Sequence, residues 1–235
     1  MEKKLELMVT KMKEACGDNL VSVLLYGSKA VTEGAGKNSD YNILVILNEA
    51  SYESQNKLVP ALSGWLSAGN TPPLVFSAEI FRGSADVFPI EFLDMKANRK
   101  ILFGADPLDG LEISKANLRH QCEFELKGKL LKLAQGCLSA RGNAGELRRV
   151  MAGSISSILV ILRHIVRLTG QEPPADKIEA AGLLGKAAGF SPDVFNSVLK
   201  LKNGEQSFDA HETEKLMAGY QEAIDKAAKY IDGLN

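Results

Sequence analysis

The feature that most constrains the fold is a change in the periodicity of the hydrophobic residues near residue 110. Before that point, stretches with strand alternation and stretches with helical spacing follow one another along the chain. After it, the strand patterns stop and long helical patterns remain. Strands and helices in alternation are typical of a sheet covered by helices, and helices joined by short loops are typical of an antiparallel bundle. The sequence therefore predicts an α+β chain of two domains, a mixed-sheet domain over residues 1–110 and an all-helical domain over residues 111–235.

The first half contains apolar, β-branched runs bounded by turn residues, which favour buried strands. Strands are expected at residues 21–26, 41–47, 74–80 and 87–95. Pro89 falls in the last of these and would place it at a sheet edge or a bulge. Helices are expected near residues 5–15, at 52–68, and in a short segment that ends at Gly104.

The second half reads as a helical bundle. Its most apolar helical segment, residues 150–162, is hydrophobic on most faces, which is the pattern of a central helix. The segment Arg141 to Gly145 is a clear loop between two long helices. Helices are expected at residues 118–140, 147–168 and 175–188, then from Ser191 and from Asp209.

Composition narrows the classes of partner and the compartment. The formal net charge is −1, so no global positive field favours long nucleic acid. The longest uncharged apolar run, residues 155–162, is far shorter than the ~20 residues that a membrane helix needs. The first residues lead into an amphipathic pattern rather than a signal peptide. We therefore expect no membrane partner.

The number and spacing of the cysteines favour a cytoplasmic location for the protein. Cys16, Cys122 and Cys137 are an odd number at wide spacings, without a CxxC pair, and the chain has only three histidines. Neither a disulfide framework nor a structural zinc site fits this set. Buried free thiols in a reducing compartment do fit it.

One ordered set of residues carries chemistry. Gly27 and Ser28 directly follow the strand 21–26, and Asp40 and Asn42 stand at the start of the next strand. A Gly-Ser pair lets the backbone approach a ligand, and the amides of the next turn point at a phosphate. Residues two apart on a strand share a face, so Asp40 and position 42 project side by side. Acids at such positions would bind Mg²⁺ ions that also hold nucleotide phosphates.

This set resembles the nucleotidyltransferase superfamily, especially its minimal and aminoglycoside-modifying branches. Their signature is a hydrophobic strand, Gly-Ser or Gly-Gly, and then Asp-x-Asp or Asp-x-Glu on the next strand; Gly27, Ser28 and Asp40 match it. The resemblance covers residues ~20–108 by pattern. It implies a transferase that moves a nucleoside monophosphate from an NTP to a hydroxyl acceptor. It also implies two Mg²⁺ ions as cofactor, with Gly27, Ser28 and Lys29 at the phosphates, although Lys29 also fits a solvated lysine.

The family's third acid usually lies on a later strand, followed by another acid and a helix that ends in glycine. Glu91, with Asp94 and Gly104 after it, fits that order. By strand parity Asp94 would lie on the opposite face from Glu91. Asp40 and Glu91 are therefore the candidate catalytic residues, and Asp40, Asn42 and Glu91 are the candidate metal ligands. Glu91 also fits a surface acid at a sheet edge.

Asn42 departs from the family pattern, since it stands where the second acid is expected. Its carbonyl can ligate Mg²⁺ but brings no charge, and one unit charge at ~4 Å is worth about 4 kcal/mol at an effective dielectric of ~20. Three functions stay open: an active transferase, a retired enzyme that still binds nucleotide, and an antitoxin-like or regulatory interaction scaffold. The acceptor is open between a small molecule, a protein side chain and an RNA end, the charge arguing against long nucleic acid. By the resemblance, the helical half would bind substrate or form a homodimer.

Overall fold

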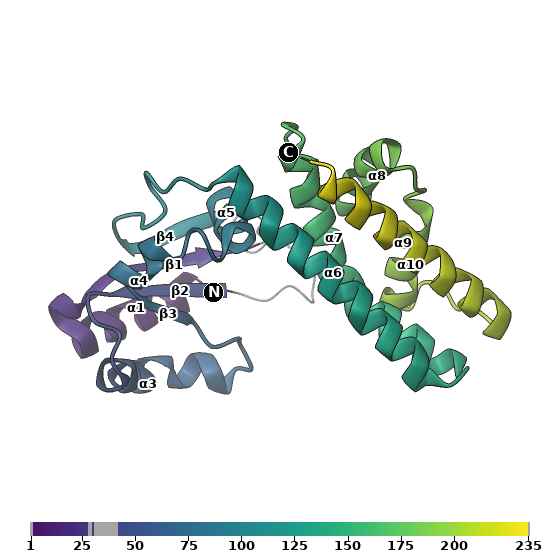
Figure 1. The fold of residues 1–235 in the computed structure, drawn as a ribbon. Helices are drawn as coiled ribbons and strands as arrows, with labels where there is room; N and C mark the ends of the chain where they lie inside the picture. Colours follow the sequence, from purple (N-terminus) through teal and green to yellow (C-terminus); the bar gives the residue numbers. More distant parts are fainter. Residues whose placement is uncertain (1, 28–29, 31–41, 235) are drawn as a thin grey trace. The chain divides into compact units, whose positions relative to one another are not determined.

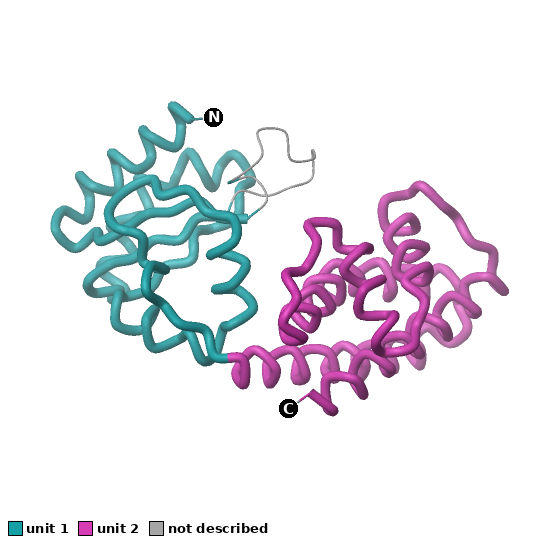
Figure 2. The backbone as a smooth tube through the Cα atoms, turned by 90° about the horizontal axis from the view of Figure 1, so that it is seen from above, with its two compact units in different colours: residues 1–114 teal, residues 115–235 magenta. Residues whose placement is uncertain are grey.

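The computed structural model describes residues 2–27, 30 and 42–234 of the 235-residue chain. It divides into two compact units, Met1–Ser114 (unit 1) and Lys115–Asn235 (unit 2), which are coloured separately in Figure 2. The described strands all belong to unit 1, and the described regular structure of unit 2 is helical. The predicted α+β class, a mixed sheet followed by helices, is confirmed.

Unit 1 is built on a mixed sheet whose described strands have the order β3-β2-β1-β4. β1 (Leu20–Tyr26) is antiparallel both to β2 (Asn42–Leu47) and to β4 (Arg99–Gly104). β3 (Leu74–Ser77) pairs parallel with β2 at one edge. β1 and β2 consist almost entirely of buried apolar residues, because helices cover the sheet on both faces.

Two separate apolar layers hold the sheet. Val23 and Val45 point to the face covered by α1 (Glu2–Cys16) and α3 (Tyr52–Ser67). Residues of these two helices and of the two strands form one core cluster. Leu24 and Leu44 point to the opposite face, where they meet α4 (Ala78–Gly83) and α5 (Pro89–Ala97) through Phe81, Phe92 and Met95. Figure 1 shows the strands between α3 and α5. Strand parity therefore assigns the residues of β2, and those of β1 from Val23 to Tyr26, to one layer each.

Two predicted elements have the wrong type. Residues 87–95 were expected to form a strand, but α5 occupies Pro89–Ala97, with Pro89 in its first turn. A proline there needs no N–H partner and has the helical φ already set, so Pro89 marks a helix start instead of a strand bulge. The short helix expected before Gly104 is instead β4. The strand expected at 74–80 ends at Ser77, whose side chain caps α4 by accepting a hydrogen bond from the Ile80 amide.

Gly104 is required where β4 ends. Its φ is +76°, and a Cβ there would lie 2.0 Å from the carbonyl oxygen of Val21. The hydroxyl of Ser22 donates to the carbonyls of Phe103 and Ala105, on either side of that glycine. The close approach of β1 and β4 at this point therefore depends on a residue without a side chain.

Unit 2 is a helical bundle, and three of its described helices begin at side-chain caps. Asn143, Asp176 and Asp209 each accept hydrogen bonds from backbone amides of the first turn that follows. Asp209 and Glu212 form a reciprocal capping box. The described helices are α6 (Lys115–Ala140), α7 (Ala144–Leu168), α8 (Lys177–Ala188), α9 (Asp193–Asn203) and α10 (Ala210–Asp232).

α7 is the central helix of this bundle. It packs against α6, α8, α9 and α10, and its buried residues include Met151, Ile158 and Leu162. By length and composition it is the one described helix that could cross a membrane, but half of its most apolar window is buried inside the protein. The apolar character of α7 is therefore used for packing within unit 2.

Candidate functional site

The turn that follows β1 requires glycine. Gly27 has a φ of +89°, its amide donates to the carbonyl of Asn98 at 3.0 Å, and its carbonyl accepts from the amide of Ala30 at 2.9 Å. A Cβ built on Gly27 would lie 3.0 Å from Nδ2 of Asn42. Position 27 is thus closed to a side chain by its backbone conformation and by its neighbour. The predicted glycine turn at the end of the strand is present.

Asn42 lies beside that turn, as the first residue of β2. Its Cα pairs with that of Tyr26 across the antiparallel ladder. Parity with the buried Leu44 and Ile46 places Asn42 on the face of the sheet that α4 and α5 cover. Its side chain is half-buried. The structure therefore brings Gly27 and Asn42 together at one end of the β1–β2 pair.

Glu91 reaches the same region from a helix. It lies in the first turn of α5 and is exposed, rather than on the predicted strand. Burial raises the pKa of the Tyr26 hydroxyl, and the negative charge of Glu91 raises that pKa further. The charge of Glu91 therefore acts on Tyr26, the residue that pairs with Asn42. In a helix, residues three apart share a side, so the expected placement of Asp94 opposite Glu91 is wrong.

Tyr26 and Arg99 are polar residues of this region that were not predicted from the sequence to belong to the site. Tyr26 pairs with Asn42 on one side and with Arg99 on the other. Arg99 donates from Nε and Nη2 to Oδ2 of Asp106, at 2.8 and 2.7 Å, and also to the carbonyl of Lys96. Asp106 in turn accepts from the amide of Leu108. Arg99 thus fastens the end of α5 and the loop after β4 to the sheet.

A sequence signal existed for one of these two residues. Tyr26 is the last strand residue before the Gly-Ser turn, so its side chain must lie at the sheet end that the turn faces. Arg99 carried no such signal, because its position depends on β4 being a strand.

Ser28, Lys29 and Asp40 lie outside the described residues, so their predicted roles stay predictions. Among the residues that the structure describes, no group of three or more histidine, cysteine, aspartate or glutamate side chains could hold a metal. Asn42 and Glu91 offer an amide and a carboxylate oxygen, which are donors that Mg²⁺ accepts. The donor chemistry fits Mg²⁺, with Glu91 as the charged member among the described residues.

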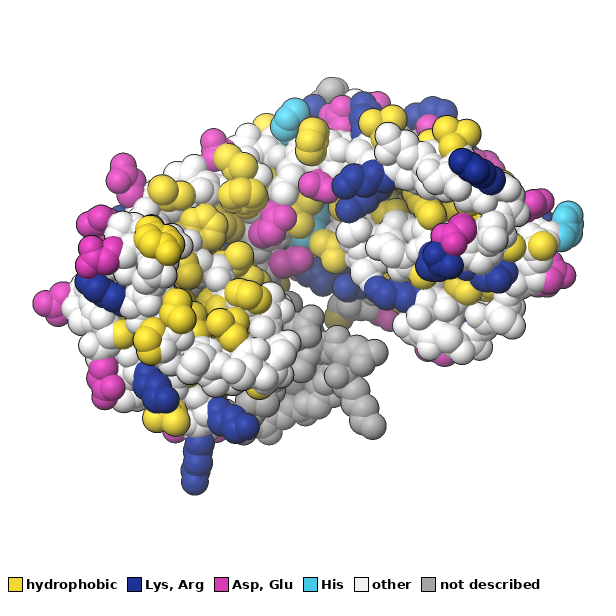
Figure 3. Space-filling view, turned by 90° about the horizontal axis from the view of Figure 1, so that it is seen from below, with side chains coloured by type: hydrophobic (Ala, Val, Ile, Leu, Met, Phe, Trp, Pro, Cys, Tyr) yellow, Lys and Arg dark blue, Asp and Glu magenta, His cyan; other side chains and the backbone are white. Residues whose placement is uncertain are grey.

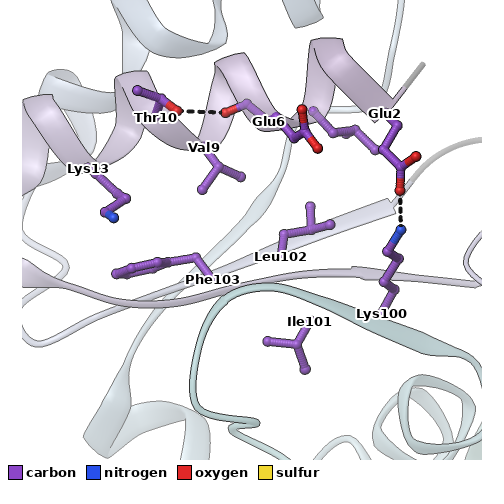
Figure 4. Close-up of a pocket in the computed structure, with 10 residues that line it drawn as sticks. Glu2, Glu6, Val9, Thr10, Lys13, Lys100, Ile101, Leu102 and Phe103 are labelled. Atoms are coloured by element: carbon purple, nitrogen blue, oxygen red, sulfur yellow. Dashed lines mark hydrogen bonds and ion pairs between the residues drawn. The ribbon is translucent and has the colours of Figure 1, made fainter.

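A cavity of about 340 Å³ lies elsewhere in unit 1, between α1 and β4 (Figure 4). Glu2 and Lys100 form an ion pair of 2.7 Å at one end, and Nζ of Lys13 lies 4.8 Å from the ring centroid of Phe103. The cavity opens on the α1 face of the sheet, because Leu102 belongs to that layer. None of Gly27, Asn42 and Glu91 lines it.

Comparison with known proteins identifies the fold. The chain is similar to spectinomycin adenyltransferase AAD(9) from Enterococcus faecialis, whose crystal structure contains ATP and spectinomycin. The two share 12% sequence identity and a TM-score of 0.58, over 99% of each chain. No protein-family model matches the sequence, and no curated protein matches it. At this identity the likeness shows a shared fold, and it confirms the predicted resemblance to the aminoglycoside nucleotidyltransferase type at that level.

Proposed function

We propose that this protein binds a nucleoside triphosphate with Mg²⁺ at the Gly27 turn and transfers the nucleoside monophosphate to a hydroxyl of a small molecule. The observation that carries this is the meeting of Gly27 and Asn42 at one end of the β1–β2 pair, where the charge of Glu91 acts on the adjoining Tyr26. It occurs in a chain that shares its fold, over 99% of its length, with an adenyltransferase crystallised with ATP and spectinomycin.

Each residue has a distinct task in this proposal. Gly27 keeps the turn free of a side chain, so a phosphate can approach the backbone. Ser28 and Lys29 contribute a hydroxyl and a positive charge to the same phosphates. Asp40 and Glu91 hold Mg²⁺, and Asn42 assists through its carbonyl oxygen. When bound, the metal stabilises the charge on the attacking and leaving oxygens.

The overall transfer balances simply. The acceptor oxygen forms a bond to the α-phosphorus, the bond to pyrophosphate breaks, and the proton of the acceptor hydroxyl passes to solvent. The products are the nucleotidylated acceptor and pyrophosphate. The free thiols of Cys16, Cys122 and Cys137 suit a cytoplasmic location for this reaction.

Asn42 favours a second candidate function, that of a retired enzyme or interaction scaffold that keeps the fold. It supplies no charge at the position where the family has its second acid. With Glu91 as the described carboxylate beside it, the metal would be held by fewer charges, and its affinity would fall. Under this alternative, nucleotide binding persists weakly or is lost, and transfer is absent.

Thermal denaturation with nucleotides tests the first step. We expect ATP, GTP, CTP or UTP to bind with a Kd of about 0.1–1 mM, or about −4 to −5 kcal/mol, and only with Mg²⁺. A ligand at ten times its Kd adds about 1.4 kcal/mol to the free energy of unfolding, so the melting temperature should rise by a few degrees. Asp40→Ala should remove this rise, and the matched control Glu79→Gln should keep it.

Pyrophosphate release in the presence of polyhydroxylated small molecules tests the second step. Release that needs both an acceptor and Mg²⁺, with a product heavier by one nucleotide, supports the transferase. A melting shift without release supports the retired enzyme. No shift with any nucleotide at millimolar concentration supports the scaffold, and a shift that is indifferent to Mg²⁺ would move the binding site elsewhere.

A further inference from the structure

A second cavity of unit 1 lies between α1 and α3 and has a volume of about 310 Å³. We call it the α1–α3 cavity. Its volume falls in the range of small-molecule sites, ~300–1,000 Å³. Met8 and Trp65 line it, and both belong to the core cluster on the sheet face that α1 and α3 cover. The cavity therefore opens from the outer side of that apolar layer.

The two helices line the cavity with the same spacing. In each of them the lining residues stand at positions i, i+3, i+4 and i+7, which share one side of a helix. The α1 wall is Lys4, Leu7, Met8 and Lys11, and the α3 wall is Ala61, Gly64, Trp65 and Ala68. Apart from Trp65, the α3 wall consists of small residues, and a Cβ built on Gly64 would meet no atom within 4 Å. The space beside Gly64 is therefore open.

Trp65 is held in place by bonds within unit 1. Its indole Nε1 donates to the carbonyl of Thr71 at 2.8 Å. Nδ2 of Asn70, which also lines the cavity, donates to the carbonyl of Trp65 at 3.0 Å. The aromatic wall is therefore preformed, and a ligand would not have to order it.

The charge of the cavity has one sign. Among the described residues that line it, the charged ones are Lys4 and Lys11, and none carries a carboxylate. Within the part of the chain that the structure describes, neither ammonium has an ion-pair partner. The cavity between α1 and β4 differs, because carboxylates line it and Glu2 there already pairs with Lys100. The α1–α3 cavity is therefore complementary to an anion.

The rim of the cavity is apolar between its two cations. Hydrophobic side chains are spread over much of the face of unit 1 that faces the reader in Figure 3, so an exposed leucine does not by itself mark a site. Leu7 differs in its surroundings. It is 57% exposed beside the hollow, with Lys4 one turn before it and Lys11 one turn after it. An apolar ligand in the cavity would cover it.

We propose that the α1–α3 cavity binds a small aromatic carboxylate, whose ring lies against Trp65 and Met8 and whose carboxylate accepts hydrogen bonds from Lys4 and Lys11. Tryptophan and methionine both make favourable contacts with an aromatic ring. The two lysines are about 10.5 Å apart along the axis of α1, and their long, flexible side chains can converge on one carboxylate between them. Such charge-assisted hydrogen bonds favour the acid over its neutral amide.

This site is separate from the proposed nucleotide site. Asn42 lies on the sheet face that α4 and α5 cover, whereas the cavity belongs to the face under α1 and α3. None of Gly27, Asn42 and Glu91 lines the cavity. The aromatic carboxylate is therefore neither the nucleotide nor the hydroxyl acceptor of the proposed transfer.

Trp65 is the one tryptophan of the chain, so its fluorescence reports on this cavity directly. Titration with 3-phenylpropionate, with excitation at the red edge of the tryptophan absorption, should give a saturable change in emission with a Kd of about 0.1–1 mM. Under the same conditions 3-phenylpropionamide and 3-phenylpropylamine, which are neutral and cationic, should bind at least about tenfold more weakly.

Two kinds of variant test the geometry. Gly64→Leu fills the open space and should abolish the fluorescence change without lowering the melting temperature, because leucine is a better helix former than glycine. Gly128→Leu, at a helical glycine of α6 whose Cβ position is also open, is the matched control. Lys4→Gln and Lys11→Gln should each weaken binding of the acid about three- to tenfold. Lys3→Gln, on α1 but not in the cavity wall, should not.

Four results would overturn the proposal. They are no saturable signal with 3-phenylpropionate up to about 10 mM, equal affinities for the acid, the amide and the amine, a folded Gly64→Leu variant that binds like the parent, and competition by Mg²⁺-ATP. Because Mg²⁺-ATP should leave the Kd of 3-phenylpropionate unchanged, loss of nucleotide binding by the protein would not affect these measurements. Failure of the proposed function and failure of this site are therefore distinguishable.

Discussion

The two units each contain a tyrosine whose pKa is raised, and the causes differ. In unit 2, burial raises the pKa of Tyr220, and the hydrogen bond of 3.0 Å with the Ser154 hydroxyl lowers it in part. In unit 1, burial raises the pKa of Tyr26 and the charge of Glu91 raises it further. The first phenol is enclosed in a core with its partner, and the second lies beside a charged side chain at the end of a sheet. The comparison separates a polar group used for packing from one placed in a candidate site.

The largest expected difference between the two tyrosines is in their contribution to the free energy of unfolding. Tyr220 is fully buried and packs edge-on against Phe195, with 5.6 Å between ring centroids. Tyr220→Ala should lower the free energy of unfolding by about 3–5 kcal/mol, measured by urea denaturation. Tyr26→Ala should cost about half as much, because Tyr26 is only partly buried. Equal losses would contradict the division between a packing phenol and a site phenol.

Gly27 provides the next largest effect. Gly27→Ala should lower the free energy of unfolding by about 2 kcal/mol, since alanine resists positive φ and its Cβ would meet Asn42. Gly17→Ala is the matched control, because Gly17 also has positive φ, +52°, but nothing lies within 4 Å of its Cβ position. Chemical denaturation should show the smaller loss at position 17. The Asn42 contact is absent in solution if the two variants lose the same amount.

Asn42→Asp tests whether the polar groups at this end of the unit 1 sheet form a metal site. The change is nearly isosteric and supplies the missing charge, so Mg²⁺-nucleotide should bind about tenfold more tightly, or about 1.4 kcal/mol. Without metal the variant should melt slightly lower, because the new carboxylate adds negative charge to a site that already has Asp40 and the charge of Glu91. Melting curves with and without Mg²⁺-NTP measure both effects, and Asp40→Ala in the same background should abolish the gain. Identical melting of parent and variant in every condition would remove position 42 from the site.

The smallest effect is a pKa. Glu91→Gln removes the charge that raises the pKa of Tyr26, so that pKa should fall by a fraction of a unit toward its ordinary value near 10. The phenol signal of Tyr26, assigned by comparison with Tyr26→Phe, can be followed by NMR from pH 8 to 12. Glu79→Gln serves as the control and should leave that pKa unchanged.

The same raised pKa gives stability a pH dependence with a definite sign. A phenol whose pKa is higher in the folded protein contributes its full stability below pH ~10 and loses it as pH rises through the folded pKa. Alkaline loss of stability should therefore be smaller in Tyr220→Phe than in the parent. In Glu91→Gln the alkaline loss that Tyr26 contributes should be smaller, because its folded pKa lies closer to the unfolded value.

The buried parts of unit 1 were the most predictable from sequence. β1 and β2 are apolar runs with β-branched residues between turn residues, buried on both faces, and this combination favours a strand. The helices of unit 2 were predictable for a similar reason, because apolar spacing over twenty residues has one period. The Gly27 turn was predictable because Gly27 and Ser28 interrupt an apolar strand pattern.

α5 and β4 were exchanged in the prediction because both are short. Ile90, Phe92 and Met95 satisfy a strand pattern in part, and the segment before Gly104 is too brief to show a period. Local spacing could not decide, and packing against Phe81 and Leu44 did. The predicted placement of Glu91 on a strand failed with α5, although its charge still acts on Tyr26. The dependence of Arg99 on Asp106 is a tertiary contact that no local pattern announces.

β1 pairs with one strand that is close to it in sequence and with one that is distant. β2 begins soon after β1, but β4 begins at Arg99, more than seventy residues after the end of β1. Bringing such distant segments together carries a loop-closure cost that slows folding. During synthesis, the Gly27 amide has to wait for the carbonyl of Asn98 to leave the ribosome before it gains its partner. The turn at the candidate site is therefore among the last parts of unit 1 to assemble, and a nascent chain ending before β4 would carry the residues of the site without its shape.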